Sequence, residues 1–235
     1  MTTDRRTTNA AQLALELEAP LALPVLPIEP EWKDQPRLWG PALHPMCSYL
    51  ASFPAALAHA FIGRYSRRGD VVFDPFSGRG TTPLQACAEG RIGVGNDLHP
   101  FAHLLTAAKV EPAGPAETAT RLAALRLGWA ATAPTWLAIA ATVVGPGRDP
   151  ASARVPAAGG GSTELVETVP AEVAVAFHPR TLAQLLYVRS TLRLADPTDR
   201  FLAAALTGIL HGKSASYLSA LMPNTFSMAP RYVRD

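Results

Sequence analysis

Residues 71–82 have the sequence Val71-Val72-Phe73-Asp74-Pro75-Phe76-Ser77-Gly78-Arg79-Gly80-Thr81-Thr82. The apolar run at the start predicts a β-strand buried on both faces, because such strands are continuously hydrophobic. Asp74 and Pro75 end the strand, since proline cannot donate a hydrogen bond to a sheet. Gly78 and Gly80 allow backbone conformations or close approaches that a Cβ would forbid. The pattern therefore predicts a strand followed by a glycine turn.

A helix is predicted directly after this turn, over residues 83–88. Thr81 and Thr82 are candidates to cap it, and Pro83 is tolerated in its first turn. The free N–H groups at a helix start, together with the positive end of the helix dipole, favour a small anionic or polar ligand. The turn is therefore a candidate binding site.

A second strand is predicted at residues 90–97, and it ends in the acid Asp97. Asp97 follows Asp74 by 23 positions, close to the roughly 20-residue spacing that puts a carboxylate on a ribose in nucleotide-binding βαβ units. The alternative is an α/β turn that binds no nucleotide and has satisfied caps. A dinucleotide is disfavoured, because its fingerprint wants a small residue at the position of Pro83.

These residues resemble the S-adenosylmethionine-dependent DNA amino-methyltransferases, which methylate N4 of cytosine or N6 of adenine. Residues 74–81 match the family's motif Asp-Pro-Phe-x-Gly-x-Gly-Thr at every fixed position. The similarity is specific over residues 40–110 and diffuse elsewhere. It implies an α/β, Rossmann-like methyltransferase fold, present in part, to which the sequence pattern adds an N-terminal arm and a helical C-terminal part.

The resemblance also implies a site for S-adenosylmethionine. Phe76, Gly78 and Gly80 would form the turn against the methionine part of the cofactor, and Asp74 would accept from its ammonium or order the turn. Asp97 would grip the ribose hydroxyls. The full implied set is His44, Pro45, Asp74, Pro75, Phe76, Gly78, Gly80, Thr81, Thr82, Asp97 and Leu98.

Four members of this set have further implied roles. Thr81 and Thr82 would hold the cofactor carboxylate at the helix start, and Leu98 would pack on the adenine. His44 would also contact the carboxylate, although a purely structural role is an equal alternative for a lone histidine.

The composition sets limits on the class of protein. The 235 residues are 48% hydrophobic, which supports a real core, and the net charge of +2 gives no overall basic field that would by itself indicate nucleic acid. Cys47 and Cys87 lie far apart without metal-ligand spacing, so we expect no metal site and a reduced, cytoplasmic location. No apolar run is long enough to span a membrane, so no membrane partner is expected.

Four segments are predicted along the chain: an arm at 1–40, a cofactor-binding domain at 41–144, a flexible linker or insertion at 145–170, and a helical segment at 171–235. Proline-rich composition indicates the arm, and a Gly/Pro/Ala-rich composition indicates the linker. Within the second segment a short amphipathic helix is predicted between residues 111 and 128, with Leu122, Leu125 and Leu127 as its apolar members.

Amino methylation also needs a pocket for a base that has left the stack. The family resembled here builds it with the tetrapeptide Asp/Asn/Ser-Pro-Pro-aromatic, and this sequence contains no Pro-Pro dipeptide. The catalytic residues are therefore left unassigned, DNA is the expected substrate, and a further segment or second chain is expected to complete catalysis.

Three other interpretations stay open at this point. The first is an inactive cofactor-binding subunit that supports a partner methyltransferase. The second is a methyltransferase that acts on RNA. The third is an NAD-dependent oxidoreductase, which Pro83 and the lack of an evident acid–base set disfavour.

Overall fold

The computed structural model describes residues 34–36, 38–49, 52–144, 154–160, 164–210, 218, 221–222 and 231–232. Apart from Asp34, all of them lie in one compact unit, residues 35–235. The predicted arm at 1–40 lies mostly outside the described residues. None of the described helices is long and apolar enough to cross a membrane.

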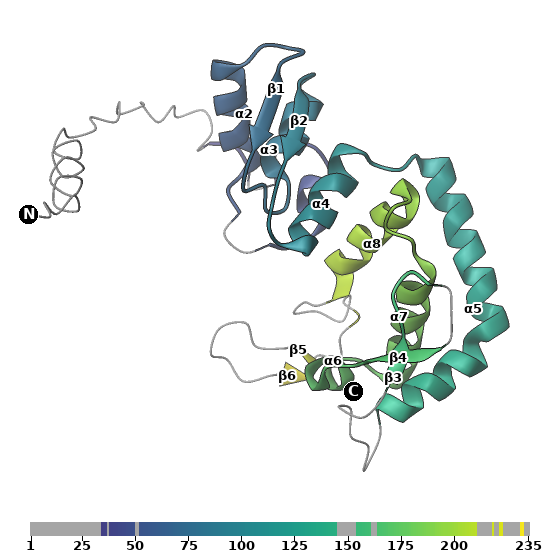
Figure 1. The fold of residues 1–235 in the computed structure, drawn as a ribbon. Coiled ribbons are helices and arrows are strands. Elements are labelled where there is room, and N and C mark those ends of the chain that lie inside the picture. The colour runs from purple at the N-terminus through teal and green to yellow at the C-terminus, as the bar shows by residue number, and fades with distance from the viewer. Residues whose placement is uncertain are drawn as a thin grey trace, which may run out of the picture. The chain divides into compact units, whose positions relative to one another are not determined.

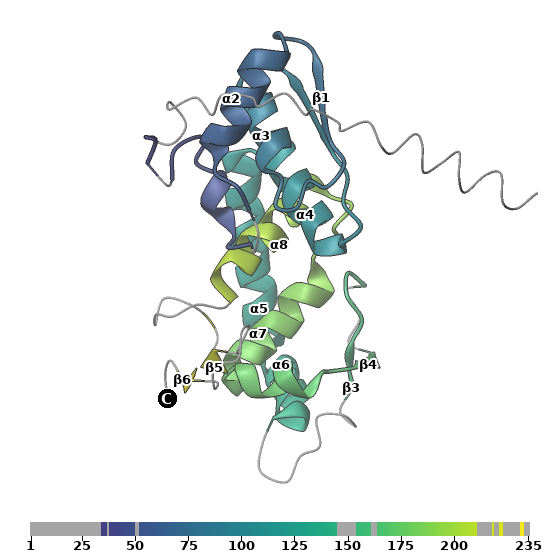
Figure 2. The ribbon, with the colours of Figure 1, turned by 90° about the vertical axis from the view of Figure 1, so that its left-hand side faces the viewer.

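A small parallel sheet stands at the centre of the N-terminal part. Its strands β1 (Val71–Asp74) and β2 (Ile92–Gly95) are joined by α3 (Thr81–Ala88), and their register pairs Val71 with Ile92 and Phe73 with Val94. The prediction of an α/β chain with a strand, a turn, a helix and a second strand is confirmed. Figures 1 and 2 show α2 (Ala55–Tyr65) and α3 on the same side of the two strands.

A glycine on the strand allows α3 to approach the sheet. A Cβ on Gly93 would lie 2.1 Å from the carbonyl oxygen of Pro83, so no other residue fits there without moving the helix. Dinucleotide-binding units place their small residue on the helix, whereas here the helix carries Pro83 and the strand supplies the glycine. Val72 packs on this side of the sheet against Ala58, Ile62 and Ala86.

The predicted burial of β1 on both faces is wrong for the described part of the chain. Val72 is half-buried beneath the helices, but Val71 is 62% exposed and Phe73 is 57% exposed. Alternate residues of a strand point to opposite faces, so one face of this sheet is packed and the other is open.

A second packing centre lies below the glycine turn. The helices α4 (Pro100–Val110) and α8 (Pro197–Leu210) pack together with the short η2 (His44–Met46). Its buried apolar members are Cys47, Leu105, Ala108 and Ala204. Through these contacts the segment before the sheet is held against the helix that follows it.

The rest of the described chain forms a mostly helical part around α5 (Pro115–Val143), α6 (Ala171–Ala176) and α7 (Pro179–Thr191). The expectation of a short helix ending near Gly128 is wrong, because α5 continues through that glycine and through Pro134. A Cβ on Gly128 would lie 2.3 Å from the hydroxyl of Tyr187, so this glycine is a packing contact and not a helix end.

The apolar core of this part comes mainly from α5, α6 and α7. Its buried members are Leu125, Trp136, Ile139, Ala140, Val143, Val155, Val169, Ala174, Ala176, Phe177, Leu182, Ala183, Leu186, Tyr187 and Leu192. Because α5 packs on α7, a domain boundary at residue 144 would separate α5 from its main packing partner. That boundary remains a prediction.

Two hairpin-like strand pairs complete the described elements. Strands β3 (Arg154–Pro156) and β4 (Leu165–Thr168) pair antiparallel, and so do β5 (Leu221–Met222) and β6 (Arg231–Tyr232). The first pair lies within the segment predicted as a flexible linker or insertion. Val155 is buried in the helical core, so this described portion is packed, and the bounds of the segment remain a prediction.

An ion pair fastens α5 to the start of α8. The guanidinium of Arg121 donates to both carboxylate oxygens of Asp199, with Nε 2.5 Å from Oδ1, and the N–H of Arg193 donates to Oδ2 at 2.9 Å. Burial alone would raise the pKa of Asp199, but these donors lower it below its ordinary value. Asp199 therefore stays ionised although its side chain is buried.

Candidate cofactor-binding site

The glycine turn lies at the carboxyl ends of β1 and β2, where ligands of open α/β sheets bind. Asp74 shapes its start by accepting from the N–H of Phe76 at 3.0 Å. The N–H of Ser77 donates to the carbonyl of Asn96 at 2.9 Å, and the N–H of Gly80 donates back to Ser77 at 2.7 Å. The turn is therefore tied to the ends of both strands.

Two glycines in left-handed backbone conformations form the bend. Gly78 has a φ of 51° and Gly80 has a φ of 80°. A Cβ on Gly80 would also lie 2.8 Å from the hydroxyl of Thr106. Both the backbone conformation and the lack of space therefore favour glycine at this position. The prediction that glycines make the turn thus has a concrete geometric basis at Gly80.

The expected capping role of Thr81 and Thr82 is wrong. Gly80 is the N-cap residue of α3, and no side-chain cap hydrogen bond forms there among the residues that the structure describes. Thr81 is buried and accepts from Nε of Arg79 at 3.4 Å, while Thr82 is half-buried. The N–H groups of residues 81 and 82 lie in the first turn of α3, where a helix has no internal acceptors for them.

Asp97 closes the turn from the end of β2. Its Oδ2 accepts from the N–H of Gly78 at 2.8 Å, and its Oδ1 accepts from the N–H of His99 at 2.9 Å. These two bonds lower the pKa of the carboxyl below its ordinary value, so Asp97 is ionised at neutral pH. The acid predicted for the ribose therefore lies directly against the glycine turn.

Two large apolar side chains are uncovered beside the turn. Phe76 is 87% exposed and follows β1, while Leu98 is fully exposed and follows β2. Both lie at the same edge of the sheet, because the strands are parallel. Exposed apolar side chains next to free helix amides are the features expected of a site for a ligand that has both an apolar and a polar part.

Comparison with known proteins bears on the segment around this turn. Residues 28–108 match the family model N6_N4_Mtase, described as DNA methylase. These residues are similar to the DNA methylase family. The resemblance to the DNA amino-methyltransferases is confirmed by this match.

Two curated relatives each match a part of the chain. The type II methyltransferase M.MthZI of Methanothermobacter thermautotrophicus is 45% identical over 56 residues, which are 23% of this chain and 16% of that protein. The type II methyltransferase M.MjaII of Methanocaldococcus jannaschii is 33% identical over 69 residues, 29% of this chain and 13% of that protein. The chain thus spans less than a fifth of the length of either relative. No solved structure matches it.

Beneath the turn of this DNA methylase segment lies a buried lysine that the sequence interpretation missed. Lys109 on α4 is 1% exposed, and its Nζ donates to the carbonyl of Arg79 at 2.8 Å and to the carbonyl of His44 at 3.4 Å. Thr106, one turn earlier, donates to the carbonyl of Gly78 at 3.3 Å. The sequence did carry a signal for the burial of this lysine, because Lys109 follows the buried Leu105 by four positions and so lies on the same helix face.

His44 and Pro45 have different surroundings, although both were implied as cofactor residues. Pro45 is exposed, whereas His44 is buried and donates from Nε2 to Oε1 of Gln85 at 3.0 Å. Burial lowers the pKa of His44, so its ring is neutral at pH 7, and its buried Nδ1 has no partner among the described residues. The role of both residues toward a cofactor remains a prediction.

We expect Lys109 to make the stability of the methylase segment depend on alkaline pH. Burial lowers the pKa of Lys109 from 10.5 to about 8, so between these values the unfolded chain holds more protons than the folded one. The free energy of unfolding should therefore rise as the pH increases from 8 to 10.5, by on the order of 3 kcal/mol at most. Chemical unfolding at pH 7.5 and at pH 10 measures this rise.

Two variants isolate the contribution of the lysine. Lys109→Met removes the titrating group and Lys109→Arg keeps a charge throughout, so both should lose the rise that the wild type shows. An equal pH dependence in all three proteins would contradict the assignment.

Proposed function

We propose that this chain is the S-adenosylmethionine-binding part of a DNA methyltransferase that methylates an exocyclic amino group of cytosine or adenine. The observation that carries the proposal is the turn at 75–80, where an ionised Asp97, two left-handed glycines and the start of α3 meet. The match of residues 28–108 to the DNA methylase family supports it. We further propose that this part has a Rossmann-like methyltransferase fold.

The residues around the turn fit the three chemical parts of this cofactor. Phe76 and Leu98 are uncovered apolar side chains that would pack on the adenine and the adjoining chain. Asp97 would accept from the ribose hydroxyls, and the amides of residues 81 and 82 would bind the carboxylate. When bound, S-adenosylmethionine supplies a methyl group on a positively charged sulfur.

The remaining members of the site would hold the turn in shape. Asp74 orders it through the N–H of Phe76, and Pro75 keeps the strand from continuing. Lys109 fixes it from below through the carbonyl of Arg79. Gly78 and Gly80 permit the left-handed bend of the turn.

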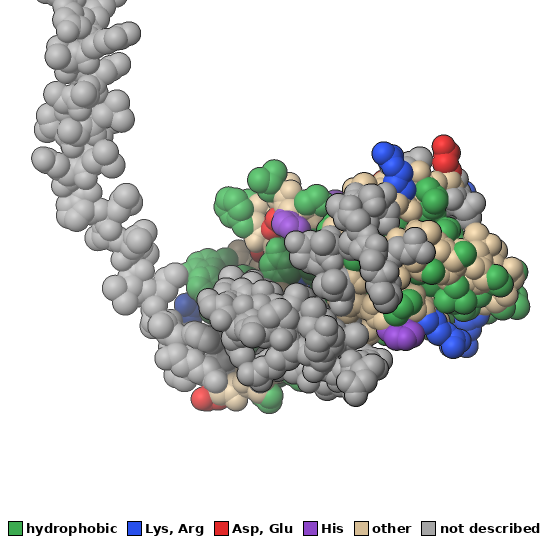
Figure 3. All heavy atoms as spheres, turned by 90° about the horizontal axis from the view of Figure 1, so that it is seen from below, with side chains coloured by type: hydrophobic (Ala, Val, Ile, Leu, Met, Phe, Trp, Pro, Cys, Tyr) green, Lys and Arg blue, Asp and Glu red, His purple; other side chains and the backbone are tan. Residues whose placement is uncertain are grey.

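The acceptor base would need groups that this chain does not carry in recognisable form. Its sequence has no Pro-Pro dipeptide, so the tetrapeptide that would orient the amino nitrogen is expected on another segment or chain. On the face drawn in Figure 3 the Lys and Arg side chains of the described residues form small separate groups.

The second candidate function is a cofactor-binding subunit without activity of its own that supports a partner methyltransferase. The absence of the Pro-Pro dipeptide favours this alternative. Both functions predict that the chain binds S-adenosylmethionine. They differ in whether the methyl group of the cofactor bound at this site is transferred to an acceptor.

A methyl-transfer assay tests the proposal. The purified chain is incubated with S-adenosylmethionine labelled in the methyl group and with DNA, and an RNA of the same sequence serves as the alternative acceptor. We expect cofactor binding without transfer by the chain alone, and transfer to DNA once the completing part is added. Unaided transfer at a normal enzymatic rate would contradict the need for a further part, and transfer to RNA alone would contradict the DNA assignment.

A further inference from the structure

Lys109 is a buried cation that has no carboxylate partner in the described part of the chain. Its side chain is 1% exposed, and its Nζ donates to two backbone carbonyl groups, that of Arg79 at 2.8 Å and that of His44 at 3.4 Å. Carbonyl groups solvate an ammonium, but they do not neutralise its charge. Because a buried charge without an opposite charge is costly, these surroundings favour the approach of an anion.

The titratable groups that face Lys109 do not balance its charge. Arg79 is a second cation, and it lowers the pKa of Lys109 further. The ring of His44 is neutral at pH 7, and Cys47 is a thiol buried in the apolar cluster between α4 and α8. Asp97, the acid of this site, accepts from two backbone N–H groups instead. The positive charge beneath the turn is therefore left uncompensated by these neighbours.

Both cations lie at the positive end of α3. Arg79 comes directly before Gly80, the N-cap residue, and its Nε lies 3.4 Å from the hydroxyl oxygen of Thr81. The helix that carries Lys109 reaches the same point, because a Cβ on Gly80 would lie 2.9 Å from the Cα of Thr106. A helix start disfavours cations and attracts anions. Positive charge is thus concentrated where an anion is already favoured.

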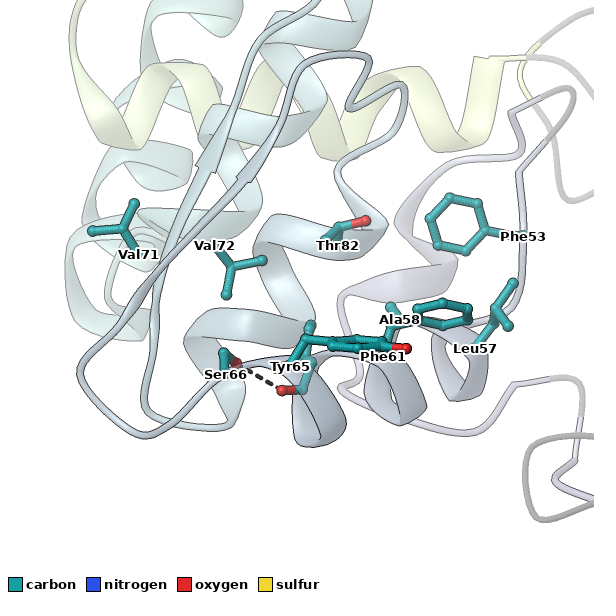
Figure 4. Close-up of a pocket in the computed structure, with 10 residues that line it drawn as sticks. Phe53, Leu57, Ala58, Phe61, Tyr65, Ser66, Val71, Val72 and Thr82 are labelled. Atoms are coloured by element: carbon teal, nitrogen blue, oxygen red, sulfur yellow. Dashed lines mark hydrogen bonds between the residues drawn. The ribbon is translucent and has the colours of Figure 1, made fainter. Parts of the chain in front are cut away.

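Few amides at the start of α3 are free to bind such an anion. The N–H of Leu84 donates to the carbonyl of Gly80 at 3.1 Å. Pro83 has no N–H, so the free donors among the described residues are those of Thr81 and Thr82. Thr82 also borders a hollow of about 390 Å³, drawn in Figure 4, whose described lining residues include no Asp, Glu, Lys or Arg. In such apolar surroundings a nearby buried charge acts more strongly than it would in water.

We propose that Lys109 is an electrostatic positioning residue for the carboxylate of S-adenosylmethionine. Its charge acts through the carbonyl of Arg79 and through space, and the amides of Thr81 and Thr82 make the direct contacts with the carboxylate. This role rests on the proposed function, because it takes S-adenosylmethionine as the ligand. It adds that the carboxylate, and not the adenosine, is the part of the ligand whose binding depends on Lys109.

A cycle of two ligands and two proteins tests this role. Calorimetry at neutral pH measures the affinity of the full chain and of Lys109→Met for S-adenosylmethionine and for its decarboxylated analogue, which keeps the adenosine, the sulfonium and the ammonium. We expect loss of the carboxylate to weaken binding about tenfold or more in the wild type and about threefold or less in Lys109→Met. Equal factors in the two proteins would overturn the role, since a lysine that only shapes the turn would affect both ligands alike.

Thr106→Val is the matched control on the same helix. It removes the hydrogen bond to the carbonyl of Gly78 but no charge, so it should weaken the binding of both ligands by the same factor.

Carbon-13 NMR of the Lys109 side chain in the wild type gives a second readout that needs no variant. Bound S-adenosylmethionine should raise the pKa of Lys109 above its value in the free chain, and the bound decarboxylated analogue should not. An unchanged pKa with S-adenosylmethionine bound would overturn the role alone. A folded chain that binds neither ligand would overturn the proposed function and this role together.

Discussion

Replacing Gly93 by alanine is expected to push α3 away from β2 and to unfold the methylase segment. The added Cβ would lie 2.1 Å from the carbonyl oxygen of Pro83 and 2.8 Å from its carbonyl carbon. Both atoms belong to the backbone, so the clash cannot be relieved by turning a side chain. We expect a loss of about 3 kcal/mol or more in the free energy of unfolding, at the upper end for overpacked sites.

Gly63 provides the matched control for this prediction. It lies within α2, and a Cβ there would meet nothing within 4 Å. Gly63→Ala should therefore stabilise the protein by about 0.5–1 kcal/mol through helix propensity. Amide hydrogen exchange of β1 and β2 reports on this segment, and protection in Gly93→Ala equal to that of the wild type would contradict the packing described.

Asp97→Ala is expected to weaken the binding of S-adenosylmethionine about tenfold or more. The carboxylate has two proposed tasks: it holds the N–H of Gly78 in the free chain and would grip the ribose hydroxyls in the complex. Asp97→Asn separates them, because an amide oxygen can still accept from Gly78 but has lost the charge. We expect its affinity to lie between those of the wild type and Asp97→Ala.

A second acid outside the site is the control for Asp97. Asp196 also accepts from two backbone N–H groups, those of Thr198 and Asp199, at the start of α8. Asp196→Ala should leave the affinity for S-adenosylmethionine unchanged, as measured by calorimetry. An equal loss of affinity in Asp196→Ala and Asp97→Ala would show a general effect on folding and not a site.

The local chain geometry of the site could be predicted from the sequence, because it depends on neighbouring residues. Proline ends a strand and glycine permits a bend wherever they occur, and β1, the turn and α3 follow from that chemistry. The cap was predicted wrongly for a local reason as well. Gly80 adopts the left-handed conformation at the N-cap, so the hydroxyls of the following threonines do not reach the first amides.

Features that depend on distant residues could not be predicted. Gly93 is needed because of Pro83, and Gly128 is compatible with a helix because Tyr187 packs against it. Lys109 is buried because carbonyl groups of two remote segments accept its hydrogen bonds. The apolar sequence of β1 predicted burial on both faces, and it could not tell that the described chain covers only one of them.

The most direct test of the proposed cofactor site is a calorimetric titration of the full 235-residue chain with S-adenosylmethionine, run beside Asp97→Ala and an NAD control. We expect saturable one-to-one binding of S-adenosylmethionine, weakened about tenfold or more in the variant, and no binding of NAD. A folded chain that binds no S-adenosylmethionine, or that prefers NAD, would contradict the proposed site.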